Sequence, residues 1–220
     1  MFDLTQRISY LLFSYLPARE ITPPEYAQMA YPKGFPMMRF EVHQYEVEGF
    51  GHFMTMDTAM MGKLMHLSTL VFTPSRGSNV PFLLIDTMQM GKKNLAYVEY
   101  YDCTAKGAAL PKCDGQKEEF ASIPDYQETP AWYIARRTPY SLIKGGKGVE
   151  KEKLDEMVLC CVRRYLSAAA GAETSPENLA GLAAFREDMC SLGNPSTKTM
   201  SKVLGTRGAE DFFRNVVMPL

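Results

Sequence analysis

The chain has 220 residues, of which 46% are hydrophobic and 22% are charged, and its formal net charge is −1 at pH 7. This size and composition suit one globular domain over residues 1–220 with a sizeable core. The near-zero net charge argues against a dedicated nucleic-acid binder, and no run approaches the roughly 18 apolar residues that a membrane span needs.

The first segment, MFDLTQRISYLLFSYLP, predicts an amphipathic helix that Asp3 caps and Pro17 stops. No small-residue cleavage site follows its apolar stretch, so we interpret this segment as a helix rather than a signal peptide. Residues 17–37 contain five prolines and predict an irregular connection.

Between about residues 38 and 102 the hydrophobic period is two, which indicates successive β-strands. Their short connections favour an antiparallel meander. Several of these segments are apolar on both faces, so we expect both faces of the sheet to be covered. The predicted strands are 39–48, 50–61, 63–72, 80–88 and 94–101.

Helical periodicity dominates the C-terminal third of the chain. Residues 103–130 are polar and rich in Gly and Pro, and GGKG at 145–148 predicts a turn. The predicted helices run from about Glu150 to Gly171 and from Ser175 to a Gly193–Pro195 break, followed by a short helix through Lys202 and a final one around Phe212. Strands followed by helices predict an α+β fold, with one antiparallel sheet between helical layers.

One carboxylate lies inside a predicted buried strand. The stretch VPFLLIDTMQMG holds a single charge, Asp86, on the same pleat face as Phe82, Leu84 and Met88. A buried carboxylate is costly unless it is hydrogen-bonded, paired or protonated. The residues alone leave two interpretations open: a strand-end Asp that caps the turn toward Gly91, or a perturbed acid at a functional site.

No motif for a nucleotide, flavin or metal is present. There is no GxGxxG fingerprint, Walker loop or GxSxG elbow. The five cysteines include no CxxC pair, and the three histidines form no ligand-spaced set with them. We therefore expect no tightly bound cofactor and a reducing compartment, the cytoplasm or, in a eukaryote, the plastid stroma.

Three collinear blocks carry a family resemblance: residues 50–88 with GKLMHLSTLVFTP and VPFLLIDTM, residues 129–158 with TPAWYIARRTPYSLIKGGKGVEKEKLDEMV, and residues 194–220 with NPSTKTMSKVLGTRGAEDFFRNVVMPL. Over roughly residues 45–220 the chain resembles the ferredoxin-dependent bilin reductases, whose superfamily includes red chlorophyll catabolite reductase. The resemblance implies a single α/β/α sandwich that reduces a linear tetrapyrrole such as biliverdin, as in phycobilin biosynthesis. Ferredoxin or flavodoxin would supply electrons singly, through radical intermediates, with no flavin or metal in the enzyme.

The resemblance also implies catalytic roles for particular residues. It places the family's catalytic Asp at Asp86, where an apolar setting can keep the acid protonated near neutral pH. The family's His on the preceding strand falls at Ser68 or Thr69. His66, two residues before Ser68, either replaces that His or is a hydrogen-bonded core residue. The family's Glu, one strand earlier, falls at Met56.

Asp57 is expected to face away from Met56 unless a bulge turns it. For the substrate's propionates, the resemblance points to Lys144 and to the Lys198–Thr199 pair. The candidate catalytic residues are Asp86, His66 and Asp57. The candidate substrate-binding residues are Met56, Ser68, Thr69, Phe72, Met88, Lys144, Lys198 and Thr199.

Basic residues have two open interpretations. Arg136 and Arg137 are candidates for binding the substrate or for docking ferredoxin, and Lys92, Lys93, Lys147 and Lys151 either add to an acidic partner's docking patch or form a solvated face. We expect a monomer or weak dimer.

The missing His and Glu leave three functional interpretations: a bilin reductase, a tetrapyrrole-binding carrier without activity, or a reductase of a chlorophyll-derived open-chain tetrapyrrole. The retained Asp86 favours the first, because a carrier has little need for a buried acid.

Overall fold

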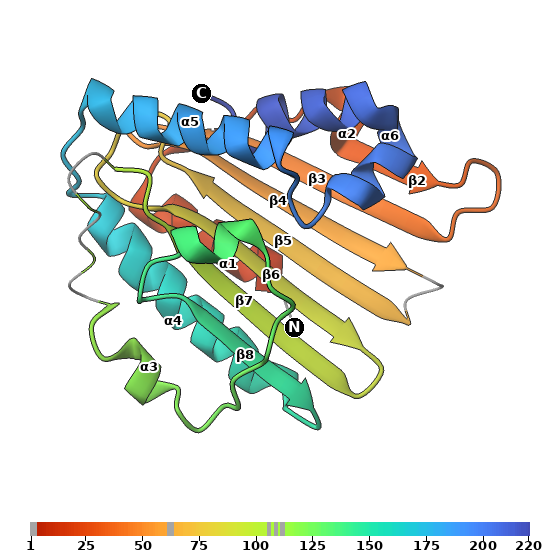
Figure 1. Cartoon of the computed structure of the whole chain (residues 1–220), viewed down its shortest axis with the longest axis horizontal. Coiled ribbons are helices and arrows are strands. Elements are labelled where there is room, and N and C mark those ends of the chain that lie inside the picture. Colours follow the sequence, from red (N-terminus) through yellow and green to blue (C-terminus); the bar gives the residue numbers. More distant parts are fainter. Residues whose placement is uncertain (1–3, 61–63, 105–106, 108–109, 111–112) are drawn as a thin grey trace.

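A computed structural model of the chain describes residues 4–60, 64–104, 107, 110 and 113–220. It confirms the α+β class: one antiparallel sheet lies between two helical layers (Figure 1). The strands are β1 Ala18–Glu20, β2 Gln28–Tyr31, β3 Met38–Val47, β4 Gly51–Met60, β5 Met65–Thr73, β6 Phe82–Met90, β7 Lys93–Tyr101 and β8 Leu142–Lys147. The helices are α1 Leu4–Tyr15, α2 Pro24–Ala27, α3 Gln116–Glu119, α4 Lys151–Ala169, α5 Pro176–Ser191 and α6 Thr197–Phe212, with a 3₁₀ turn η3 at Trp132–Arg136 and a π turn η4 at Phe213–Val217.

The sheet has the order β1-β3-β4-β5-β6-β7-β8, with β2 also paired to β3. Every pairing is antiparallel, and neighbouring strands from β3 to β7 follow one another in sequence. The five strands predicted from the period-two pattern are therefore confirmed in type and order. The predicted N-cap Asp3 and the predicted strand ends Met61 and Lys63 lie outside the described residues.

Two cores cover the two faces of the sheet. One contains side chains of α1 and α4 with Leu83, Ile85 and Phe72; we call this side the α1/α4 face. The other contains side chains of α5 and α6 with Phe82 and Val71; we call it the α5/α6 face. In Figure 1, α5 and α6 lie in front of the sheet, while α1 lies behind it. The alternation of Phe82 and Leu83 shows why the predicted strands are apolar on both faces.

Two sequence predictions were wrong about edge strands. Residues 17–37 are not wholly irregular, because β1, α2 and β2 lie within them and pair with or pack on β3. Of the glycines predicted to form a turn, Gly145 and Gly146 lie in β8 instead, and only Gly148 is in the turn that follows. Gly145 has φ +127°, and a Cβ there would approach the Asn94 carbonyl oxygen to 2.2 Å. Glycine at this position therefore lets β8 approach β7 closely enough to pair.

The C-terminal helices follow the predicted signals. Ser175 caps α5 by accepting a hydrogen bond from the Glu177 amide. The stretch named α6 contains a break at Gly205, where φ is +77°, so a short helix through Lys202 precedes a second one. No helix among the described residues is long and apolar enough to cross a membrane.

Phe72 offers a test of the α1/α4 core. Its side chain is 0% exposed, with its ring 4.6 Å from the Phe53 ring and 5.5 Å from the Tyr165 ring. Phe72→Ala is expected to lower the free energy of unfolding by about 3–5 kcal/mol in urea denaturation. The matched change Phe35→Ala, at a side chain that is 82% exposed, is expected to have almost no effect. Equal losses in both variants would contradict this assignment of the core.

Candidate functional site

Asp86 lies on the α5/α6 face of the central strand β6. Its cross-strand partners are Thr69 on β5 and Tyr97 on β7. Phe82 and Leu84, on the same face of β6, pack in or against the α5/α6 core. The Asp86 side chain is partly buried in this apolar setting, which agrees with the pleat face predicted from the sequence.

The environment of Asp86 shifts its acidity toward neutrality. Burial raises the pKa of Asp86 from its ordinary value of 3.8 to about 6, while a hydrogen bond that Thr69 Oγ1 donates to the carboxylate acts in the opposite direction. Desolvation is the larger effect, since it disfavours the charged form. A carboxyl group with this pKa can hold and release a proton near neutral pH.

A network of paired charges lies beside Asp86 on the β7 side. Arg137 Nε donates to Glu99 Oε1 over 2.7 Å, and Arg137 Nη2 donates to Glu128 Oε1 over 2.8 Å. The Tyr101 hydroxyl also donates to Glu99, over 2.6 Å, and the Tyr133 ring lies 5.9 Å from the guanidinium of Arg137. These bonds attach the segment that carries Glu128 and Arg137 to the same face of the sheet as Asp86.

Burial affects the titration of this network as well. It raises the pKa of Tyr97 to about 12, so this phenol stays neutral beside Asp86. Burial also raises the pKa of Glu99, and the nearby positive charge of Arg137 opposes that rise. Arg137, a sequence candidate for binding the substrate, is buried with its donors engaged by two glutamates. Arg136 is more exposed and lies 3.7 Å from Asp188.

The pairing register of β4, β5 and β6 shows which residues flank Asp86 on the side away from β7. Thr69, not Ser68, is opposite Asp86, and Met56 is opposite Thr69 on β4. Met56 is buried in the α5/α6 core, and Met88 lies two residues after Asp86 on the same face of β6, partly buried. These four predicted residues, Asp86, Thr69, Met56 and Met88, are brought together by the structure.

Three other predicted residues share the opposite face. Asp57 accepts hydrogen bonds from Ser68 Oγ and, over 3.1 Å, from Thr5 Oγ1 of α1, and His66 Nε2 lies 3.8 Å from Asp57 Oδ1. The β4–β5 pairing runs without a bulge from His52–Thr73 to Met60–Met65. This placement contradicts the interpretation of His66 as a replacement for the family's His beside Asp86. It confirms that Asp57 faces away from Met56, because no bulge turns it toward Asp86. Phe72 also belongs to the α1/α4 core and not to the Asp86 face.

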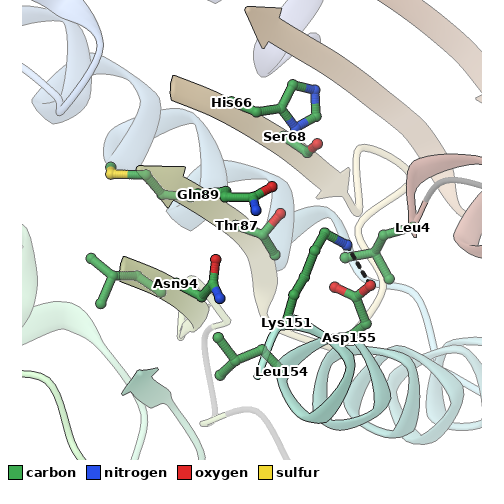
Figure 2. A pocket seen from close by; sticks show the side chains of 11 residues that line it. Leu4, His66, Ser68, Thr87, Gln89, Asn94, Lys151, Leu154 and Asp155 are labelled. Atoms are coloured by element: carbon green, nitrogen blue, oxygen red, sulfur yellow. Dashed lines mark hydrogen bonds and ion pairs between the residues drawn. The ribbon is translucent and has the colours of Figure 1, made fainter. Parts of the chain in front are cut away.

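Figure 2 shows the surroundings of His66 and Ser68 on the α1/α4 face. A cavity of about 20 Å³, lined also by Thr87, Asn94 and Lys151, has room for little more than a water molecule. Lys151 forms an ion pair with Asp155 at its wall. A broader groove of about 710 Å³ continues past His66 and Gln89 toward Arg39. This polar region is separated from Asp86 by the thickness of the sheet.

The predicted propionate ligands lie apart from one another. Lys144 is 4% exposed, pairs with Ala96 of the α1/α4 core, and places its Nζ 2.8 Å from Asp125 Oδ1. The structure therefore does not bring Lys144 to Asp86. Lys198 is exposed and Thr199 partly buried at the start of α6, in the layer that covers the Asp86 face.

Sequence reasoning missed Glu99, Arg137 as its ion-pair partner, Glu128 and the tyrosines beside Asp86. Glu99 had a signal, because it is a single charge inside the apolar strand NLAYVEYY, as Asp86 is in its own strand. Glu128 and Tyr133 lie in or next to an irregular segment, where no hydrophobic period assigns a face. Among the residues that the structure describes, no group of three His, Cys, Asp or Glu side chains is arranged to hold a metal ion.

The raised pKa of Asp86 predicts a pH-dependent stability effect. Ionisation of this carboxyl costs more in the folded state than in the unfolded chain, so the cost develops between about pH 4 and pH 6 and is complete above pH 6. Asp86→Asn removes the charge, so its free energy of unfolding should exceed that of the wild type by up to about 3 kcal/mol at pH 8. Urea denaturation at pH 4 should show no such gain. A variant less stable than the wild type at pH 8 would contradict the shifted pKa.

Comparison with known proteins identifies the fold. No family model matches the chain, and no curated protein matches it. Among solved structures, it is similar to phytochromobilin synthase from tomato in complex with biliverdin, with a TM-score of 0.71 and 10% sequence identity. The match covers 96% of this chain and 81% of the tomato chain. The chain therefore has the fold of this tomato phytochromobilin synthase.

Proposed function

We propose that the chain reduces a linear tetrapyrrole, such as biliverdin, on the α5/α6 face of its sheet. Electrons come one at a time from reduced ferredoxin or flavodoxin, and Asp86 donates a proton. The observation that carries this proposal is Asp86 itself, a partly buried acid whose pKa is about 6. The fold shared with a protein crystallised with biliverdin supports the choice of substrate class.

The chemistry requires a proton source next to a flat apolar surface. Reduction of one double bond consumes two electrons and two protons, and each added electron makes the bound tetrapyrrole more basic. Asp86 transfers its proton to the substrate and is reprotonated from solvent. A substrate that covers Asp86 excludes water and raises the pKa of the carboxyl further, which keeps the acid loaded at neutral pH.

The residues around Asp86 suit a hydrophobic ring system. Met56 on β4 and Leu84 and Met88 on β6 are apolar side chains around Asp86 and Thr69 on the same face of the sheet. Methionine adapts its shape to irregular surfaces and makes favourable contacts with aromatic rings. The Tyr97 hydroxyl, neutral at physiological pH, can donate a hydrogen bond beside the acid.

A second candidate function is tetrapyrrole binding without reduction. The positions that flank Asp86 on β5 and β4 are Thr69 and Met56, neither of which titrates near neutral pH. A carrier needs no second proton donor, so these two residues favour that alternative. A chlorophyll-derived open-chain tetrapyrrole would use the same apolar face, and comparing the two substrates separates these cases.

The test begins with the absorbance spectrum of the protein mixed with biliverdin, recorded anaerobically before and after adding reduced ferredoxin. A shifted bilin band that then bleaches or moves is expected for the reductase. Asp86→Asn should still shift the band, but its rate of bleaching should fall roughly 100-fold or more, since general acid catalysis contributes about that factor.

Asp57→Asn is the matched control, because Asp57 lies on the other face of the sheet. Its bleaching rate should equal that of the wild type. A band that shifts in the wild type but never bleaches would favour the carrier. Full activity in Asp86→Asn would exclude Asp86 as the proton donor.

A further inference from the structure

Three unpaired lysines meet at one end of the sheet. Lys92 lies in the connection from β6 to β7, Lys93 begins β7, and Lys147 ends β8. Lys93 and Lys147 are direct cross-strand partners, although like charges placed opposite one another destabilise a sheet. Within the described part of the chain, none of the three has a carboxylate within ion-pair distance, whereas Lys144 and Lys151 nearby each have one. We call Lys92, Lys93 and Lys147 the lysine corner.

The lysine corner is connected to the Asp86 face by side-chain contacts. Lys93 has the same strand parity as Tyr97, so both project from the α5/α6 face. Lys93 Nζ donates to the Tyr126 hydroxyl over 3.1 Å and lies 4.4 Å from the centre of its ring. The Tyr126 ring is in turn 6.2 Å from the ring of Tyr97, the cross-strand partner of Asp86.

The distance along the sheet is short. Tyr97 is the fourth residue after Lys93, and Met90 is the fourth residue after Asp86, which corresponds to about 13 Å at the usual rise of a strand. Figure 1 shows the β6–β7 connection and the end of β8 together at the end of the sheet that lies away from α5 and α6. A protein that bound there would therefore approach the Asp86 face from the end of the sheet opposite to α5 and α6.

We propose that the lysine corner is the docking surface for the acidic one-electron carrier protein that supplies this site, an inference that rests on the proposed function. An acidic partner would relieve the Lys93–Lys147 repulsion and be steered to the corner by its charge. Each docking event transfers one electron to the bound tetrapyrrole, and the carrier leaves in its oxidised form. Two events, with protons from Asp86 and solvent, reduce one double bond.

A second copy of this chain is a poorer occupant. Two copies related by a twofold axis would present the same lysines to each other, and the like charges would repel. Within the described residues the charge of Lys93 is not neutralised by a carboxylate, because its contacts are a hydrogen bond and a cation–π contact with the neutral Tyr126. An acidic partner would supply the carboxylates that this corner lacks.

The test compares two double variants with the same change in net charge. K92E/K147E reverses the corner, and K33E/K202E reverses two exposed lysines in the β2–β3 connection and on α6. Isothermal titration calorimetry with a [2Fe–2S] ferredoxin at low salt should show binding to K92E/K147E weakened about tenfold or more. Binding to K33E/K202E should match the wild type.

Folding and the proposed function are controlled separately. K147E creates an opposite-charge pair with Lys93, so the unfolding midpoint of K92E/K147E should not fall. Equal ferredoxin affinity in the wild type and K92E/K147E overturns the docking surface, whether or not biliverdin is reduced.

Reduction of biliverdin by dithionite, which needs no docking protein, should proceed equally in the wild type and K92E/K147E. If dithionite does not reduce biliverdin on the wild type, that result counts against the proposed function. The docking surface is then decided by the ferredoxin affinities from calorimetry. A loss confined to K92E/K147E with dithionite would mean that the corner serves the substrate, and this also overturns the inference.

Discussion

The unbroken period-two register of β4, β5 and β6 is the constraint on which the site depends. Because no bulge interrupts these pairings, each position has a fixed face. Asp86, Thr69 and Met56 fall on the α5/α6 face, while Asp57 and Ser68, each adjacent in sequence to one of them, fall on the other. A shift of one residue in any of these strands would exchange the two sets.

This register creates two polar environments from similar residues. Asp57 accepts hydrogen bonds from the hydroxyl groups of Ser68 and of Thr5 on α1, next to an open groove. Among the described residues, Asp86 accepts a side-chain hydrogen bond from Thr69 alone and has apolar neighbours, so burial is the larger effect on its pKa. The first arrangement joins α1 to the sheet. In the second arrangement, ionisation of Asp86 lowers the free energy of unfolding. A marginally stable domain tolerates such a cost best at a group that its function requires.

Much of this architecture could be predicted from the sequence, because the alternation from residue 38 to 101 directly reports strands buried on both faces. Asp86 was identifiable as a charge in an apolar run. Whether His66 shares a face with Asp86 could not be predicted, because that depends on Thr69 being the cross-strand partner of Asp86. Pairing register is a property of two strands and not of either sequence alone. β8 was missed because its glycines are typical of turns, and Glu128 because its segment has no period.

The most direct test of this account is the titration of Asp86 in the folded protein, with and without biliverdin. Infrared difference spectra between the wild type and Asp86→Asn isolate the carbonyl stretch of the protonated carboxyl. The account predicts a midpoint near pH 6 in the free protein and a higher one with biliverdin bound. A midpoint near the ordinary value of 3.8 that biliverdin leaves unchanged would contradict Asp86 as the proton donor.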